Sequence, residues 1–180
     1  VTYWDTADCY EGGRSEVGIG QFLGKYPEVR KQLFLVTKSD ARDPAGMTKL
    51  LDRSLERMKT DFIDLYFIHG MRDINELNQD TKAWVEKAKA NGRIKFFGFS
   101  THSNMEDCMV GAARLGWIDG IMMTYNFRIM HSDKMQSAVE ACVKAGIGLC
   151  AMKTQGGGSV TMESETELKL AGRFLKLGFS

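Results

Sequence analysis

The sequence has few of the features that assign a chain to a specialised class of protein. It contains only 4 cysteines in 180 residues, and its 24 basic side chains nearly balance its 23 acidic ones. No apolar run approaches the ~20 residues that a transmembrane helix needs, and no clustered basic segment suggests a nucleic-acid partner. No two cysteines have the C-x-x-C spacing of a zinc site. These absences predict a single globular domain without a membrane, nucleic-acid or metal partner.

Cysteine usage also bears on the compartment. The four cysteines, Cys9, Cys108, Cys142 and Cys150, are dispersed along the chain. Dispersed cysteines in a chain of this size are typical of a reducing compartment, which predicts a cytoplasmic location. The chain opens inside an apolar, strand-like run and shows no signal peptide, so we expect its natural start to lie upstream.

Apolar runs alternate with helical patterns along the chain. Six strand-like runs begin roughly 30 residues apart, the spacing of βαβ units: Thr2–Trp4, Leu33–Thr37, Phe62–Ile68, Ile94–Phe99, Gly120–Thr124 and Ile147–Met152. Each gap contains apolar residues at helical spacing. Gly92 and Gly146 lie where helices should end, and Ser103 with Glu106 predicts a capping box. Strict alternation of this kind predicts parallel strands with right-handed crossovers.

Two architectures satisfy this pattern, a closed barrel and an open doubly wound sheet. The open sheet usually carries G-x-G-x-x-G after its first strand. Gly12, Gly13 and Gly18 do not have this spacing, and the cluster Gly156-Gly157-Gly158 follows the last run instead. The absence of the motif favours the barrel.

Four reactive side chains follow successive strand-like runs. Asp5 and Tyr10 follow the first run, Lys38 the second and His69 the third. In a barrel of parallel strands these ends share one face, where active sites form. Singly, each residue is more often a turn, packing, solvated or core residue than a catalytic one. Together, an acid, a phenol, an amine and an imidazole can protonate a carbonyl oxygen, which predicts a catalytic site.

Five motifs in order resemble those of the aldo-keto reductases: Asp5-Thr6-Ala7 with Tyr10 and Ser15-Glu16, Val36-Thr37-Lys38, Ser54-Leu55 with Asp61 to His69, Gly98-Phe99-Ser100, and Tyr125-Asn126. The resemblance implies an α/β fold of the (β/α)8 TIM-barrel type, here an incomplete barrel of about six βα units. Residues 1–180 would form one domain that lacks the first and last barrel strands. We therefore expect a gap between the outer strands and exposure of interior residues such as Phe97 and Ile121.

The resemblance also implies a reaction, the NAD(P)(H)-dependent interconversion of an aldehyde or ketone and its alcohol. Tyr10 would donate the proton, and the ammonium of Lys38 would lower the pKa of Tyr10. Asp5 would pair with Lys38, and His69 would orient the substrate oxygen. We expect the Tyr10 hydroxyl within about 2.6–3.5 Å of the Lys38 ammonium.

Cofactor contacts are expected from the later strand ends. Ser100, Thr101 and Asn126 are candidates for the nicotinamide carboxamide, because an amide needs both donors and acceptors; His102 is an alternative to Thr101, and Asp5 also lies within the expected cofactor site. The segment after the last run offers Lys153, Gln155 and Gly156 to the pyrophosphate, although it could equally be a flexible loop. NADP(H) is favoured over NAD(H).

Two other functions fit parts of the pattern. A non-catalytic barrel could bind nicotinamide as a sensor or accessory subunit, although it would not need all four reactive residues. An unrelated phosphate-handling isomerase or lyase could use Lys38 as a Schiff-base amine, but Tyr10 would then have no role. The expected partner is a small-molecule carbonyl substrate, and nothing in the sequence indicates the oligomeric state.

Overall fold

The computed structural model describes residues 1–156, 172 and 176 of the chain, and strands and helices alternate within this part. The strands are β1 (Tyr3–Asp5), β2 (Phe34–Ser39), β3 (Ile63–Ile68), β4 (Ile94–Thr101), β5 (Gly120–Thr124) and β6 (Gly148–Met152). The α-helices are α1 (Arg14–Lys25), α2 (Pro44–Met58), α3 (Gln79–Ala90), α4 (Met105–Leu115) and α5 (Asp133–Lys144). Three short 3-10 helices are η1 (Tyr10–Gly13), η2 (Pro27–Gln32) and η3 (Ile74–Glu76). Each predicted strand run overlaps one observed strand.

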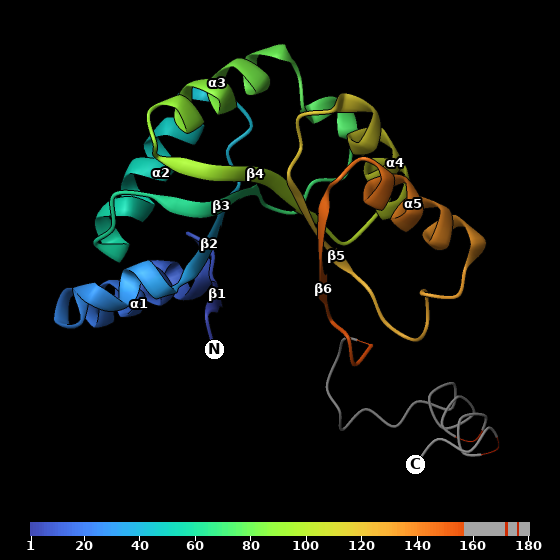
Figure 1. The fold of residues 1–180 in the computed structure, drawn as a ribbon, viewed down its shortest axis with the longest axis horizontal. Helices are drawn as coiled ribbons and strands as arrows, with labels where there is room; N and C mark the ends of the chain where they lie inside the picture. The colour runs from blue at the N-terminus through green and yellow to red at the C-terminus, as the bar shows by residue number, and fades with distance from the viewer. Residues whose placement is uncertain (157–171, 173–175, 177–180) are drawn as a thin grey trace.

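The six strands form one parallel sheet in the order β1-β2-β3-β4-β5-β6. Figure 1 shows the sheet as an arch with the helices outside its curve, which is half of a barrel. In the described part of the chain, β1 pairs only with β2 and β6 only with β5. The prediction of an incomplete (β/α)8 barrel with a gap between its outer strands is confirmed.

Helix ends follow local rules in two places and depart from them in one. Gly92 and Gly146 both have positive φ, of 69° and 74°, just past α3 and α5, as predicted for C-terminal glycines. The predicted capping box at α4 is wrong. Asn104 precedes that helix in a left-handed conformation with φ of 51° and no side-chain cap. The hydroxyl of Thr101 instead donates to the carbonyl of Ser103, so the local turn uses a different hydrogen bond.

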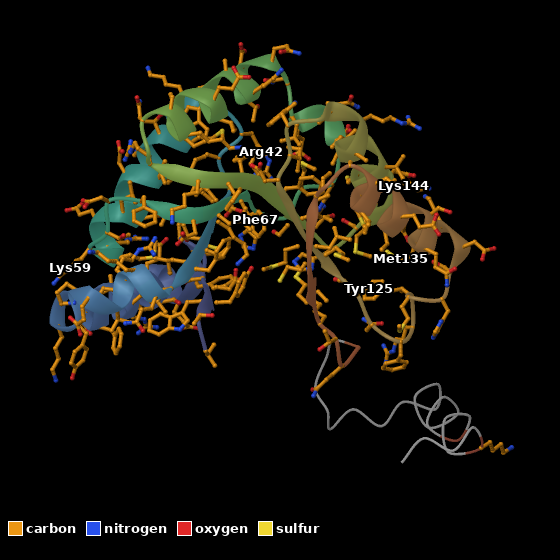
Figure 2. All side chains as sticks on the ribbon, in the orientation of Figure 1. Arg42, Lys59, Phe67, Tyr125, Met135 and Lys144 are labelled. Carbon is orange, nitrogen blue, oxygen red and sulfur yellow. The ribbon has the colours of Figure 1, made fainter. Side chains whose placement is uncertain are left out.

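Side chains alternate between the two faces of the sheet and create two apolar regions. The larger lies between the sheet and the helices, and a smaller one on the concave face contains Val36, Leu65, Phe67 and Met122. Figure 2 shows Phe67 on this concave side. The expected exposure of Phe97 and Ile121 is wrong, since both are 0% exposed.

A one-residue difference in phase explains the error, because consecutive strand residues face opposite sides of a sheet. Phe97 points toward the helices and lies near Trp84 and Trp117, with ring centroids 6.4 and 5.9 Å away. Its neighbour Phe96 occupies the concave face, is 44% exposed and stacks near Phe34. The incomplete barrel thus exposes Phe96 rather than Phe97.

Candidate active site

Lys38 is the centre of the candidate site and is only 1% exposed. Lys38 lies on the same face of β2 as Phe34 and Val36, so its side chain enters the barrel interior. Leu35 faces the other way and packs on the helix side. The ammonium donates to both carboxylate oxygens of Asp5, at 2.8 and 2.7 Å, and to the carbonyl of Thr6 at 2.7 Å. An ammonium has three protons. All three are therefore bound inside the protein.

Tyr10 lies beside Lys38 but not in the expected contact. The ammonium is 5.1 Å from the centre of the Tyr10 ring, and the ring meets that of His69 edge-on at 5.8 Å. In the described part of the chain no hydrogen bond joins the Tyr10 hydroxyl to Lys38. The expected Tyr10–Lys38 hydrogen bond is absent in this arrangement because Asp5 and Thr6 take every ammonium proton.

The pKa shifts of Tyr10 and Lys38 also differ from the expectation, because Asp5 pairs with Lys38. Burial, followed by the charge of Asp5, raises the pKa of Tyr10. Burial lowers the pKa of Lys38, and Asp5 opposes this shift. With Asp5 neutralising the ammonium, the predicted lowering of the Tyr10 pKa does not occur here. A phenol with a raised pKa stays protonated at neutral pH, which is the state that a proton donor needs.

His69 follows β3 and is held by its backbone. Its N–H donates to the carbonyl of Ser39 at 2.9 Å, and its carbonyl accepts from Arg42 at 2.8 Å. Its Nδ1 lies 3.7 Å from the Cys9 sulfur and 3.4 Å from a carboxylate oxygen of Asp40. Burial lowers the pKa of His69. A neutral imidazole has one donor and one acceptor nitrogen, so it can orient a polar substrate atom.

A second layer behind these residues fixes the loop after β1. The hydroxyls of Thr6 and Ser15 are 2.7 Å apart. Buried Glu16 accepts from Thr37 at 2.7 Å and from Arg57 at 3.1 Å, and Arg57 also donates to the Asp8 carbonyl at 2.9 Å. The conformation of the Asp5–Tyr10 segment therefore depends on α1 and α2. Sequence reasoning quoted Ser15-Glu16 as a motif but did not identify this network.

Ser100 and Thr101 end β4 and are buried. The Ser100 hydroxyl accepts from the backbone N–H of Gly70 at 3.0 Å, and among the described residues no group accepts its own proton, which a ligand could therefore use. The Thr101 hydroxyl donates its proton to the backbone carbonyl of Ser103, so this proton is used within the loop. Ser100 therefore suits a ligand contact better than Thr101 does.

Asn126 links the loops after β5 and β6. Its side-chain amide donates to the Lys153 carbonyl at 3.1 Å and accepts from the Arg128 backbone N–H at 3.0 Å. Lys153 and Gln155 are exposed in the turn after β6, and the Gly156 N–H donates back to the Lys153 carbonyl at 2.9 Å. The predicted glycine cluster continues into residues 157 and 158, which lie outside the described residues.

The described part of this rim suits a charged, amide-bearing ligand. A Cβ built on Gly156 would lie 3.3 Å from the Arg128 guanidinium, and the φ of 94° also favours glycine here, so the backbone approaches this cation closely. Lys153 adds a second cation, and Ser100 and Asn126 add amide partners. Burial is the main cause that lowers the pKa of His102, and the charges of Lys153, His69 and Lys38 lower it further. These groups therefore lie along one rim. Sequence reasoning missed Arg128, because no spacing rule links it to Gly156.

One further cluster was not expected. Cys9, Asp40 and His69 offer ligand atoms that all lie within 4.8 Å of one another. They are far apart in sequence and come from three strand ends, so no short motif could reveal them.

The profile of the Aldo/keto reductase family matches residues 1–173 of the sequence. The chain belongs to this family. It is 33% identical over 113 residues to the uncharacterized oxidoreductase YqkF of Bacillus subtilis, a match that covers 56% of the chain and 36% of the relative. It is 28% identical over 176 residues to the aldo-keto reductase yakc of Schizosaccharomyces pombe, whose name specifies NADP(+), covering 89% and 50% respectively.

A solved aldo/keto reductase of Klebsiella pneumoniae in complex with NADP and acetate superposes with a TM-score of 0.69 at 25% identity, covering 84% of this chain and 52% of that one. The chain thus spans about half the length or less of these relatives. Within the described residues, no helix has the length and apolar character needed to cross a bilayer.

Proposed function

We propose that the protein containing this chain reduces an aldehyde or ketone with NADP(H), or oxidises the corresponding alcohol. The observation that carries this proposal is the part-buried Asp5–Lys38 ion pair with Tyr10 and His69 beside it. Membership of the family supports the same reaction, and the names of yakc and of the Klebsiella complex support NADP. Four free cysteines are consistent with the cytoplasmic location that we also propose.

A nicotinamide cofactor, once bound, would supply the hydride for the carbonyl carbon. Tyr10 then gives its phenolic proton to the developing alkoxide, which leaves a phenolate. The ammonium of Lys38 lies 5.1 Å from the Tyr10 ring and stabilises this phenolate, while His69 orients the carbonyl oxygen. Since Asp5 and Thr6 accept all three ammonium protons, the Tyr10 oxygen would bond to Lys38 only in exchange for one of these hydrogen bonds.

We assign the cofactor contacts by the donors and acceptors each part of it needs. Ser100 and Asn126 would hold the carboxamide, with Thr101 as a packing neighbour. Lys153, Gln155 and Gly156 would meet the phosphates, next to the cation of Arg128. Asp5, held by its pairing with Lys38, would also contribute to the nicotinamide end of the cofactor site.

A second candidate is a nicotinamide-binding barrel without turnover. The missing Tyr10–Lys38 hydrogen bond favours it, because a donor that never reaches the ammonium would stabilise its phenolate poorly. The two functions differ in one measurement. A reductase consumes NADPH in the presence of an aldehyde, whereas a sensor binds NADPH and leaves it unchanged.

The test is Tyr10→Phe, which keeps the ring and removes the proton. We expect unchanged NADPH binding by fluorescence titration and a fall in kcat of about 10²–10⁴-fold, the usual contribution of a general acid. Tyr26→Phe is the matched control, because Tyr26 has the same 39% exposure on the far end of α1. Equal kcat in Tyr10→Phe and Tyr26→Phe would show that another group donates the proton.

A further inference from the structure

Three metal-ligating side chains meet at the rim of the site. Cys9 follows β1, Asp40 directly follows β2 and His69 directly follows β3. Their ligand atoms are the thiol sulfur, a carboxylate oxygen and the Nδ1 nitrogen, and all lie within 4.8 Å of one another. Asp5, Tyr10 and Lys38 are not part of this cluster.

The distances between these ligand atoms match those expected around a tetrahedral zinc ion. With a Zn–S distance of about 2.3 Å and Zn–N and Zn–O distances of about 2.0–2.1 Å, tetrahedral geometry separates ligand atoms by roughly 3.3–3.6 Å. The Cys9 sulfur is 3.7 Å from Nδ1 of His69, and that nitrogen is 3.4 Å from Asp40. Two of the three pairs are therefore already at the spacing that an ion requires.

The backbone holds the three ligands in register before any ion binds. The N–H of Asp8 donates to the Lys38 carbonyl at 3.0 Å, which ties the Cys9 loop to β2. The N–H of His69 donates to the Ser39 carbonyl at 2.9 Å, which ties the end of β3 to the residue before Asp40. Ligands attached to hydrogen-bonded strand ends need little ordering when an ion binds.

Charge at the cluster favours a cation. The neighbouring cations are already matched by acids: Lys38 by Asp5, Arg53 by Asp8 and Arg42 by Glu76. The Asp40 carboxylate pairs with no lysine or arginine in the described part of the chain, and the one ion-pair partner of its side chain there is His69. A metal-bound cysteine becomes a thiolate. Asp40 and Cys9 would then present two negative charges to the ion.

We propose that Cys9, Asp40 and His69 bind a thiophilic divalent cation of the Zn²⁺ type. Thiolate and imidazole ligands select such ions over Mg²⁺ and Ca²⁺, which prefer oxygen. Three protein ligands leave a fourth position open to water, as in zinc sites that are not purely structural. The site uses Nδ1 of His69 and does not depend on reductase activity.

The first test is a Co²⁺ titration of the untagged protein, followed by absorption spectroscopy, with Zn²⁺ as competitor. We expect one bound ion with a thiolate-to-cobalt charge-transfer band and visible bands of tetrahedral intensity. Cys9→Ser should lose the charge-transfer band, and Asp40→Asn should keep it but weaken binding by about tenfold or more. Cys150→Ser is the matched control, since Cys150 is also free but lies on β6, and it should match the wild type.

A second measurement uses the unmodified chain and so does not depend on the folding of any variant. Zn²⁺ should slow the alkylation of Cys9 by iodoacetamide, read peptide by peptide by mass spectrometry, and leave Cys150 unaffected. Absence of Co²⁺ binding, a charge-transfer band that persists in Cys9→Ser, or equal alkylation of Cys9 with and without Zn²⁺ would each overturn the proposal.

Discussion

Two glycines in α1 should respond to alanine with opposite signs. A Cβ on Gly20 would lie 1.9 Å from the carbonyl oxygen of Arg57 in α2, whereas a Cβ on Gly18 would meet nothing within 4 Å. Gly18 is exposed and Gly20 is buried, although they are two residues apart in the same helix. At Gly20, therefore, α1 lies close against the backbone of α2.

The magnitudes follow from helix propensity and from overpacking. Gly18→Ala should stabilise the fold by about 0.4–1 kcal/mol, because alanine loses less conformational freedom on folding. Gly20→Ala brings the same gain in conformational entropy. However, the Arg57 carbonyl must move away by more than roughly 1 Å to reach a normal contact distance. Overpacking of this kind costs about 1–3 kcal/mol. The net effect should be a loss of about 1–2 kcal/mol.

The assay is urea unfolding of the wild type and both variants at pH 7. In thermal unfolding, a change of 1 kcal/mol corresponds to a Tm shift of about 2–4 °C for a domain of this size. Arg57 also donates to Asp8 and Glu16 behind the active-site loop, so Gly20→Ala should lower kcat as well. A Gly20→Ala protein as stable as Gly18→Ala would refute the close approach of the two helices.

Three further predictions concern charged groups. Asp64→Asn should destabilise the fold by about 3 kcal/mol at pH 7, because it leaves buried Arg30 unpaired. Although burial alone would raise it, hydrogen bonds from the Leu35 N–H, Lys95 and Arg30 lower the pKa of Asp64. Its stabilisation is thus present above the ordinary value of 3.8 and is lost as the pH falls through the lowered pKa of the folded state, so the stabilities of wild type and variant should converge at acidic pH. Asp5→Asn should lower the pKa of Lys38 further, so the alkaline limb of a kcat profile should move to lower pH; an unmoved limb would contradict the pairing. Lys153→Ala should raise the Kd of NADPH about tenfold, the usual worth of a hydrogen bond to a charged group, and leave kcat unchanged; a fluorescence titration showing equal Kd would remove Lys153 from the site.

Much of the fold could be read from the sequence because its signals are local. Gly92 and Gly146 end helices since only a residue that tolerates positive φ fits there. Apolar runs at regular spacing predicted every strand. Ser103 failed as a cap because Asn104 takes a left-handed conformation, a competition between turns that spacing alone does not resolve.

Which face of a strand points inward was harder to predict, since one residue of phase exchanges the two faces. In β4 both Phe96 and Phe97 are apolar, so their pattern cannot select the inner one. Contact with Trp84 and Trp117 decides it, and those residues lie in α3 and in the segment after α4, outside the strand itself. Long-range packing of this kind is invisible to periodicity.

In the candidate site, too, the positions of the residues could be predicted from the sequence, but the hydrogen bonds between them could not. Strand ends placed Asp5, Tyr10, Lys38 and His69 on one rim, as topology requires. Their hydrogen bonds depend on which groups accept the three protons of the Lys38 ammonium. One acceptor is the backbone carbonyl of Thr6, which no side-chain pattern in the sequence could indicate. The absence of a Tyr10–Lys38 hydrogen bond among the described residues follows from this set of acceptors. In the reaction that we propose, a Tyr10 hydroxyl without a bond to Lys38 would be available to the substrate first, and its phenolate would interact with Lys38 only afterwards.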